Sequence, residues 1–481
     1  VGNVHAVALL SAVLWALNPI NTQEVTYNVQ RMASMAAMFY VMAMYFYLRG
    51  RQTPSIKGAA GWFFLCALSG LLAVGSKENA VLLPLSLILM EFVLIKPPAV
   101  LFTKKRIWIS MAAIAGIAAV TLIIRGPSFF SFTWLQEGYD IRPFTLWERV
   151  LTQPRILIFY LTLIFYPMPG RLSICHDIQI STGLFSPPET IIAIFALAAL
   201  AAAAILSRKK FPVFSFAVLF FFINHLVEST IFPLELIFEH RNYLPSMFLF
   251  VPIVASIYGS WNRLNSPKLM KFCISSGLTL IIVGFGSATH MRNYAWETEG
   301  TLWFDAAVKA PELLRPRNNL GKFYFSIGRY EDAYTQHTVA LNLKLIHNVN
   351  EYYLPNYNLG LEYQRRGGLI KALEHYRNSL LYNNHYAPAH NNIGAISADL
   401  GWETEEILKA FQRAVLLAPT NYTYHNNLGY ALLRNGEIEE AGKKFREALE
   451  LNSTNKASFK GLGYIHRLEG VNGKAFYFFN K

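Results

Sequence analysis

Charged residues are scarce in this chain. They make up 15% of its 481 residues, whereas ordinary soluble domains carry about 25%. The deficit is uneven, because residues 1–290 contain one apolar run after another and residues 291–481 have the composition of a soluble helical domain. This division predicts two domains, a polytopic transmembrane domain over 1–290 and a water-facing domain over 291–481.

Cysteines and familiar catalytic signatures are also few or missing. The three cysteines, Cys66, Cys175 and Cys273, form no CxxC pair, so neither a disulfide framework nor a metal site is indicated. The sequence has no HExxH, GxSxG, P-loop or GxGxxG pattern, which argues against a metalloprotease, a serine hydrolase, an ATPase and a dinucleotide-binding enzyme. The net charge of +13 does not predict nucleic-acid binding, because much of the excess lies in short loops between apolar runs.

The apolar runs approach the length of roughly 20 residues that a membrane-spanning helix needs. They cover 3–18, 31–48, 60–75, 79–95, 107–125, 150–167, 188–207, 211–226, 243–260 and 271–289. Four basic loops lie between them, at 49–57, 95–106, 207–210 and 261–271. Such loops favour the cytoplasmic side, and all four can lie there only if 150–167, with Pro154 and Arg155, is re-entrant or interfacial. Nine crossings then remain, and the residues after 289 face the outside.

A second kind of regularity begins after residue 290. Glycines recur with gaps of 39, 34, 35 and 34 residues, at Gly321, Gly360, Gly394, Gly429 and Gly463. Tetratricopeptide repeats are helix pairs of 34 residues, and Ala441 and Phe445 follow Gly429 where small and large residues close such a pair. The pattern predicts about five repeats, with an insertion near 343–353, stacked into an α-solenoid that binds a protein or peptide partner.

Polar residues gather on the predicted outer face at four places, of which 18–31 is the first. Pro19 ends the first apolar run, and Asn21 and Glu24 have the spacing of a capping box that starts a helix. One face of this helix would carry Gln23, Glu24, Asn28 and Arg31. The cluster is either a helix cap with interfacial anchors or part of a site.

The second and third clusters lie in later outer loops. In the second, 75–84, Lys77 and Glu78 form either a solvated turn or a place where Lys77 holds a phosphate. The third covers 139–155 and 171–181, with Asp140, Arg142, Glu148, Arg149, Arg155, Arg171, His176 and Asp177. Most of these fit ordinary loop charges, but Arg155 lies in an apolar setting, and ionisable residues at membrane depth are functional candidates.

The fourth cluster is the stretch FEHRNYLP, residues 238–245. Asn242 is suited to be an N-cap, which predicts a helix whose N-terminus faces the outer surface and attracts an anion. Arg241 would add a bidentate fork for a phosphate, with Glu239 pairing with it or orienting it. His240 would donate a hydrogen bond or shuttle a proton. Alternatively, Glu239 and Arg241 only tie the loop together.

The chain as a whole resembles a known family. The stretches 5–51, 75–92 and 238–246, followed by the repeats, are similar to the TMTC family of transmembrane and tetratricopeptide-repeat-containing O-mannosyltransferases. The resemblance implies an all-α fold, in which a GT-C-like polytopic membrane helix bundle is followed by a tetratricopeptide-repeat solenoid. It also implies transfer of a sugar from a polyprenyl-phosphate carrier to Ser or Thr of a protein held by the repeats. No cofactor is implied besides this lipid-linked sugar donor, and Asn18 stands where the family usually has His.

Such a reaction needs a carboxylate to deprotonate the hydroxyl and cations to stabilise the leaving phosphate. The resemblance places the catalytic Asp in the first outer loop, which we expect to precede the residues present here. The remaining supporting acids would be Glu24, Glu78, Glu239 and Asp177. The lipid phosphate would be held by Arg241, Arg31, Lys77, Arg155 and His240.

Two other functions stay open. A non-enzymatic membrane scaffold would use the repeats to recruit periplasmic proteins. A lipid or polysaccharide transporter would have paired half-helices and an ionisable residue near mid-membrane, whereas the acids and bases here lie at the ends of the apolar runs. The resemblance favours a multi-pass protein of a bacterial inner membrane, with the repeats in the periplasm.

Overall fold

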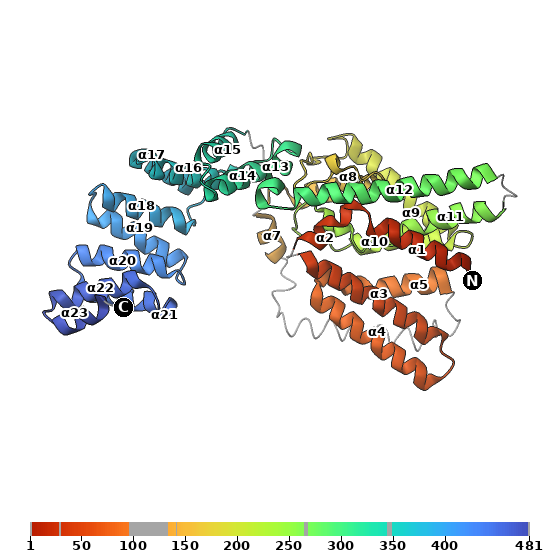
Figure 1. Cartoon of the computed structure of the whole chain (residues 1–481), viewed down its shortest axis with the longest axis horizontal. Coiled ribbons are helices and arrows are strands. Elements are labelled where there is room, and N and C mark those ends of the chain that lie inside the picture. Colours follow the sequence, from red (N-terminus) through yellow and green to blue (C-terminus); the bar gives the residue numbers. More distant parts are fainter. Residues whose placement is uncertain are drawn as a thin grey trace. The chain divides into compact units, whose positions relative to one another are not determined.

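The computed structural model describes residues 2–27, 30–95, 133–140, 142–263, 268–343 and 349–479. All regular structure within these residues is helical and they form no β-strand, which confirms the predicted all-α class. The chain divides into two compact units, Val1–Ala310 and Pro311–Lys481 (Figure 1). The first unit therefore extends beyond the predicted boundary at residue 290.

The predicted apolar runs account for most helices of the first unit. These helices are α1 (Gly2–Ala16), η1 (Pro19–Asn21), α2 (Thr22–Thr26), α3 (Arg31–Gln52), α4 (Ile56–Ser76), η3 (Glu78–Leu82), α5 (Leu83–Met90), η4 (Glu91–Ile95), α7 (Thr133–Asp140), α8 (Leu146–Phe165), η7 (Pro169–Arg171), α9 (Glu189–Ser207), α10 (Pro212–His225), η8 (Glu239–Asn242), α11 (Phe250–Arg263), α12 (Lys268–Ala295) and α13 (Glu299–Lys309). The predicted run 107–125 lies outside the described residues, as does most of the basic loop 95–106. Each of the other runs contains a helix.

Helix α10 lies at the centre of the first unit. Phe216 and Phe220 pack into one apolar core with side chains of α3, α4 and α5. Ala217 and Phe221, one position further along, pack into a second core with side chains of α1, α8 and α11. Because helical neighbours point in different directions, this short helix joins both halves of the bundle.

Several peripheral helices turn apolar side chains outward. Phe64 on α4 exposes 68% of its surface and Leu206 on α9 exposes 83%. Soluble monomers rarely leave large contiguous apolar surfaces open, and such surfaces mark contacts with membranes or other proteins. The outward-facing side chains of these helices are therefore typical of a surface that contacts a membrane or another protein.

Fewer helices of the described residues have the length and composition of a membrane span than the nine predicted crossings would need. Among the described residues four helices are long and apolar enough to cross a membrane, namely Lys57–Ser76, Glu78–Ile95, Glu189–Ser207 and Lys268–Ala295. A fifth results if the bent pair of Val4–Ala16 and Pro19–Thr26 is one span. Helices α10 and α11 are shorter, and α3 is less apolar. The nine crossings stay a prediction, as does the re-entrant or interfacial placement of α8, which is one continuous helix despite Pro154.

The second unit is a series of helix pairs at the predicted positions. They are α14 (Leu314–Ser326) with α15 (Tyr330–Asn342), α16 (Tyr353–Arg365) with α17 (Leu369–Tyr382), α18 (Ala387–Asp399) with α19 (Thr404–Leu417), α20 (Tyr422–Arg434) with α21 (Ile438–Leu451) and α22 (Lys456–Leu468) with α23 (Asn472–Phe479). A short 3-10 helix, η9 (Val349–Tyr352), lies in the predicted insertion. A Cβ on Gly429 would lie 2.7 Å from the ring of Phe445, so glycine at this position lets the two helices of a pair approach closely.

A second glycine ends the first helix of each pair. These glycines adopt positive φ angles and are Gly328, Gly367, Gly401, Gly436 and Gly470. At Gly436, with φ +85, the amide of Glu437 donates to the carbonyl of Leu432 over 3.0 Å. This is the cap that a left-handed glycine permits at a helix C-terminus. The turn between the helices therefore depends on glycine as much as the close packing does.

Asparagines link successive repeats. Asn358 Nδ2 donates to Asn318 Oδ1 over 2.9 Å, and Asn427 Nδ2 donates to Asn391 Oδ1 over 2.8 Å. Each bond joins the first helices of neighbouring repeats, and such a bond contributes about 1 kcal/mol net. These contacts favour one register between repeats.

His337 takes the place of an aromatic residue in the first repeat. It faces Gly321 as Phe445 faces Gly429, and only 1% of it is exposed. Burial disfavours the charged imidazolium and lowers the pKa of His337 to about 4.

We expect the first repeat to lose stability as the pH falls. The unfolded histidine has a pKa of about 6.5, above the folded value, so the unfolded chain binds more protons between these two values. The free energy of unfolding then falls by about 2 kcal/mol between pH 7 and pH 5. His337→Phe should abolish this fall, as measured by hydrogen–deuterium exchange of α14 and α15 corrected for intrinsic rates. His385→Phe, at an exposed histidine, is the control, and equal protection of the unaltered protein at both pH values would contradict the prediction.

Candidate functional site

A group of buried and half-buried ionisable side chains lies where α2, η3, η8 and the loop after α10 meet. We call it the outer polar cluster, and its members are Glu24, Lys77, Glu228, Glu239, His240 and Arg241. The turn after α1 helps to form it, because Asn18 Oδ1 accepts from Ile20 N over 3.1 Å and Asn18 Nδ2 donates to Ile164 O over 2.8 Å. Asn18 is therefore a buried structural cap.

Glu228 is the centre of the cluster. Its carboxylate lies 3.2 Å from Arg241 Nε and 3.4 Å from Lys77 Nζ. Asn79 Nδ2 donates to the same carboxylate over 3.1 Å, and only 7% of Glu228 is exposed. Sequence reasoning missed this residue, although a single acid directly after the apolar run 211–226 was a signal that could have revealed it.

Arg241 has an ion pair, hydrogen bonds and a ring contact with its surroundings. Besides Glu228, it donates to the carbonyl oxygens of Glu235 over 2.8 Å and Leu236 over 3.2 Å, and its guanidinium lies 5.3 Å from the ring centroid of Phe238. The predicted pairing of Arg241 with Glu239 is wrong, because Glu228 occupies the position beside the guanidinium. Arg241 thus binds together the loop that precedes it.

Glu239 has different partners. Its Oε1 accepts from Ser173 N over 2.6 Å and lies 2.9 Å from His176 Nε2. Only 2% of Glu239 is exposed, whereas the neighbouring Asp177 is open to solvent. The third and fourth sequence clusters therefore meet through His176 and Glu239.

The helix predicted to start at Asn242 starts later. Asn242 is buried within η8, and its Nδ2 donates to Glu239 O over 3.1 Å. Residues 243–249 form turns, with Met247 N donating to Leu244 O over 3.2 Å, and α11 begins only at Phe250. The prediction of an anion at a helix N-terminus here is therefore wrong, because the Asn242 side chain closes a 3-10 turn instead of capping an α-helix.

His240 is buried against its neighbours. Its ring stacks on Phe238 with centroids 5.0 Å apart, and its backbone amide donates to Gln23 Oε1 over 3.2 Å. Burial, together with the nearby charges of Lys77 and Arg241, lowers the pKa of His240 to about 2. The imidazole is therefore neutral at physiological pH.

Glu24 is the least satisfied member of the cluster. It is fully buried, and neither carboxylate oxygen has a hydrogen-bond partner among the described residues. Burial, reinforced by the nearby Glu239 and Glu228, raises the pKa of Glu24 to about 8, so this side chain is mostly protonated at neutral pH. Helix α2 starts after Asn21 as predicted, but the capping box does not form, because Asn21 Nδ2 donates to Trp15 O over 2.8 Å.

The remaining predicted residues lie apart from this arrangement. Arg155 donates to Gln179 O over 2.7 Å and to Ser181 Oγ over 3.2 Å. Exposed side chains with no ion pair or side-chain hydrogen bond within the described residues are Arg31, Glu78 and Asp177. Asn28 lies outside the described residues. Within the described part of the chain, no group of three His, Cys, Asp or Glu side chains is placed to hold a metal ion.

A polar stripe on α8 holds the loop that carries the cluster. Arg149 is fully buried and donates to the carbonyl oxygens of Glu228 over 2.6 Å and Thr230 over 2.9 Å, and also to that of Leu234. One turn later, Gln153 Nε2 donates to Leu236 O over 3.0 Å. Residues four apart share a helix face, so these side chains act together as a clamp. The sequence suggests that Arg149 is an ordinary loop charge, whereas in the structure Arg149 donates hydrogen bonds to buried carbonyl groups.

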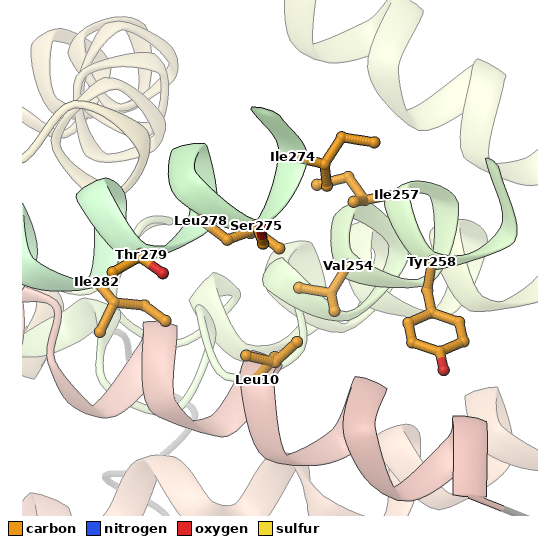
Figure 2. A pocket seen from close by; sticks show the side chains of 9 residues that line it. All are labelled: Leu10, Val254, Ile257, Tyr258, Ile274, Ser275, Leu278, Thr279 and Ile282. Atoms are coloured by element: carbon orange, nitrogen blue, oxygen red, sulfur yellow. The ribbon is translucent and has the colours of Figure 1, made fainter. Parts of the chain in front are cut away.

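An apolar cavity of about 270 Å³ lies between α1, α11 and α12. Figure 2 shows Leu10, Val254 and Ile282 pointing into it, and Ser275, Thr279 and Tyr258 are the lining residues that carry a hydroxyl group. No charged residue lines it. The cavity suits hydrocarbon and is distinct from the outer polar cluster.

Comparison with known proteins supports part of the predicted resemblance. A family model for the tetratricopeptide repeat matches residues 422–455, which confirms a repeat at α20 and α21. The human protein O-mannosyl-transferase TMTC3 is 24% identical over 256 residues, which make up 50% of this chain and 27% of that protein. The chain thus spans about a quarter of the length of this curated relative. It is similar to TMTC3 in sequence and carries at least one such repeat.

Two solved structures are similar to part of this chain. YrrB, a TPR protein, is 19% identical with a TM-score of 0.32, over 37% of this chain and 88% of that chain. MamA from Desulfovibrio magneticus RS-1 is 17% identical with a TM-score of 0.31, over 35% of this chain and 91% of that chain.

Removing the charge of Glu228 should destabilise the first unit. Glu228→Gln leaves Arg241 and Lys77 buried without their counter-charge, and breaking a buried pair in this way costs about 3–5 kcal/mol. The matched control is Glu235→Gln, because Glu235 pairs with Arg142 but has a side chain that is 45% exposed, and such pairs contribute about 0–1 kcal/mol. Unfolding in detergent, followed by circular dichroism, measures both. Equal losses in the free energy of unfolding for the two variants would contradict the prediction that Glu228 stabilises the first unit more than Glu235 does.

Proposed function

We propose that this chain belongs to a membrane glycosyltransferase that moves a sugar from a polyprenyl-phosphate carrier to Ser or Thr of a protein acceptor. The outer polar cluster carries the proposal, because three buried carboxylates and two cations converge there from separate segments. Burying charges is costly, and strongly perturbed ionisable groups concentrate at functional sites. The similarity to a protein whose name states O-mannosyl transfer supports the same chemistry.

Lys77 is the side chain best suited to hold the lipid phosphate. Its ammonium has three donors, and its ion pair with Glu228 is long at 3.4 Å. Its side chain remains 18% exposed, whereas that of Arg241 is 5% exposed and already serves Glu228 and two carbonyl groups. We therefore assign phosphate binding to Lys77 and a positioning role to Arg241 and His240. Arg31 and Arg155 lie on other contacts or on the surface and have at most an auxiliary role.

The other parts of the chain have roles that follow from this chemistry. In this proposal the cluster lies beside the apolar helices at the membrane surface, where a polyprenyl phosphate presents its head group. A solenoid of stacked helix pairs offers a concave surface for an extended polypeptide, so the repeats would hold the acceptor. We place the reaction on the outer side of a bacterial inner membrane, within a GT-C-like bundle and without a cofactor other than the lipid-linked donor.

A membrane scaffold without catalytic activity is the second candidate. The observation in its favour is that Arg149 and Arg241 donate hydrogen bonds to the backbone carbonyl groups of one loop. A cluster that only orders this loop would need no substrate. The repeats would then recruit proteins to the membrane, and the buried charges would fix the shape of the outer surface.

Sugar transfer by the full-length protein in lipid nanodiscs distinguishes the two. The assay follows labelled mannose from mannosyl-phosphoryl-polyprenol to peptides rich in Ser and Thr. Lys77→Met should lower kcat/KM by about 100-fold or more, because loss of one preorganised charge at a developing anion has an effect of this size. Lys209→Met, at an exposed lysine in a predicted cytoplasmic loop, should leave transfer unchanged. Capture of proteins by the repeats without any transfer would favour the scaffold.

A further inference from the structure

We infer that the first helices of the repeats bind an extended, proline-containing polypeptide through its backbone. A transferase and a scaffold would both use the repeats to hold a protein, so this binding does not depend on sugar transfer. The side chains that carry it are a row of asparagines and a group of tyrosines, and all of them lie in the second unit.

The first helices form the inner side of the stacked repeats. Helix α14 contacts α16, α18 contacts α20, and α20 contacts α22 across successive repeats. Within the described residues, no second helix contacts the next second helix as extensively. Helices that approach one another more closely lie on the inside of a curved stack, so the first helices line its concave face.

Asparagines of this inner face form a ladder of hydrogen bonds through four repeats. The residue two positions before a close-packed glycine donates its Nδ2 to the residue three positions before the glycine of the preceding repeat. The bonds join Asn358 to Asn318 over 2.9 Å, Asn392 to the hydroxyl group of Tyr357 over 3.3 Å, and Asn427 to Asn391 over 2.8 Å. Because the same bond recurs from repeat to repeat, the carboxamide groups form one row along the stack.

The ladder leaves hydrogen-bonding capacity at its surface. A carboxamide has two N–H donors and an oxygen that accepts two hydrogen bonds. Asn358 and Asn427 each use one donor in the ladder, and Asn358 Oδ1 has no partner within the described residues. Both side chains are half-buried, so they remain open to a ligand. A row of groups that donate and accept matches the N–H and C=O groups of an extended polypeptide.

A group of tyrosine rings lies directly beside the ladder. The ring of Tyr386, at the start of α18, lies 4.9 Å from that of Tyr353 and 5.0 Å from that of Tyr357 between centroids. All three side chains are half-buried. Tyr357 also accepts the hydrogen bond of Asn392, so the rings and the ladder form one continuous surface.

The combination of rings and donors favours a particular ligand. Proline-rich segments adopt the polyproline II conformation, whose backbone groups stay unpaired, and they bind in grooves lined by aromatic rings. Because proline has no N–H, such a ligand offers more acceptors than donors, and carboxamide and hydroxyl groups supply the missing donors. The side chains of this surface are uncharged asparagines and tyrosines, so the ligand is recognised by backbone and shape.

The first test changes the ligand and leaves the protein unaltered, so protein folding does not influence the result. The probe is a fluorescent peptide of repeated Ala-Thr-Pro units, and its anisotropy measures the Kd for the full chain in nanodiscs. Esters in place of the Ala–Thr amides remove N–H groups and weaken the carbonyl acceptors while every side chain is kept. They should raise Kd about fivefold or more, the effect of one lost hydrogen bond. Alanine in place of proline should also raise Kd.

Variants of the protein then locate the surface. Asn358→Ala should raise Kd about fivefold for the proline peptide and for the alanine peptide, because both present a backbone. Tyr386→Leu should weaken binding of the proline peptide more than that of the alanine peptide. Asn378→Ala is the matched control, since Asn378 is also half-buried but lies on the second helix α17, and it should leave both Kd values unchanged. Thermal unfolding followed by circular dichroism shows whether each variant is folded.

Each contrary outcome has a distinct meaning. Equal affinity for the ester and amide peptides would overturn recognition through the backbone. Unchanged binding in both Asn358→Ala and Tyr386→Leu would overturn the assignment to this surface. Displacement of the peptide by excess mannose would identify a sugar site instead, and failure of the unaltered protein to bind the proline peptide would also overturn the inference. None of these outcomes bears on sugar transfer, which is measured separately.

Discussion

The outer polar cluster depends on Glu228, which lies beside the buried Arg241 and the half-buried Lys77. Arg241 and Lys77 approach this carboxylate from η8 and from the end of α4. Taking a charge out of water costs several kcal/mol unless a counter-charge and hydrogen bonds accompany it. Arg241 could therefore not be buried without Glu228, and the ion pairs of Glu228 with Arg241 and Lys77 hold the three segments that carry these residues together.

The loop between α10 and α11 also needs buried partners, in this case hydrogen-bond donors for its backbone carbonyl groups. Irregular backbone buried in an apolar bundle leaves carbonyl groups that need donors. Arg149 and Gln153 supply them from one face of α8, and further along that face Tyr160 donates to Phe238 O over 2.9 Å. The polar stripe on an otherwise apolar helix is thus explained by the loop that it binds, and α8 is as much a support for the cluster as a part of the bundle.

The sequence predicts the regular parts of this protein and fails at the contacts between them. Helices and repeats follow from patterns within short stretches of sequence, such as the regular recurrence of glycine from Gly360 to Gly429. Such patterns do not depend on contacts between distant segments. The partner of Arg241 is different, because Glu239 is near in sequence whereas Glu228 becomes near only when the loop folds back. The start of α11 was also missed, since Asn242 can cap a helix or close a 3-10 turn, and buried tertiary contacts decide between the two. By contrast, the spacing of Arg149 and Gln153 was a usable signal of a helix face that binds backbone.

The charge balance of the outer polar cluster bears on what it can do. With His240 neutral and Glu24 mostly protonated, because burial raises its pKa to about 8, the carboxylates of Glu228 and Glu239 face the cations of Lys77 and Arg241, and the charges of the cluster balance. Both cations already lie beside Glu228. An added anion could therefore be held only at the edge of the cluster, where Lys77 is the partly exposed side chain. The buried charges thus fix the loop, and only this edge is open to a ligand.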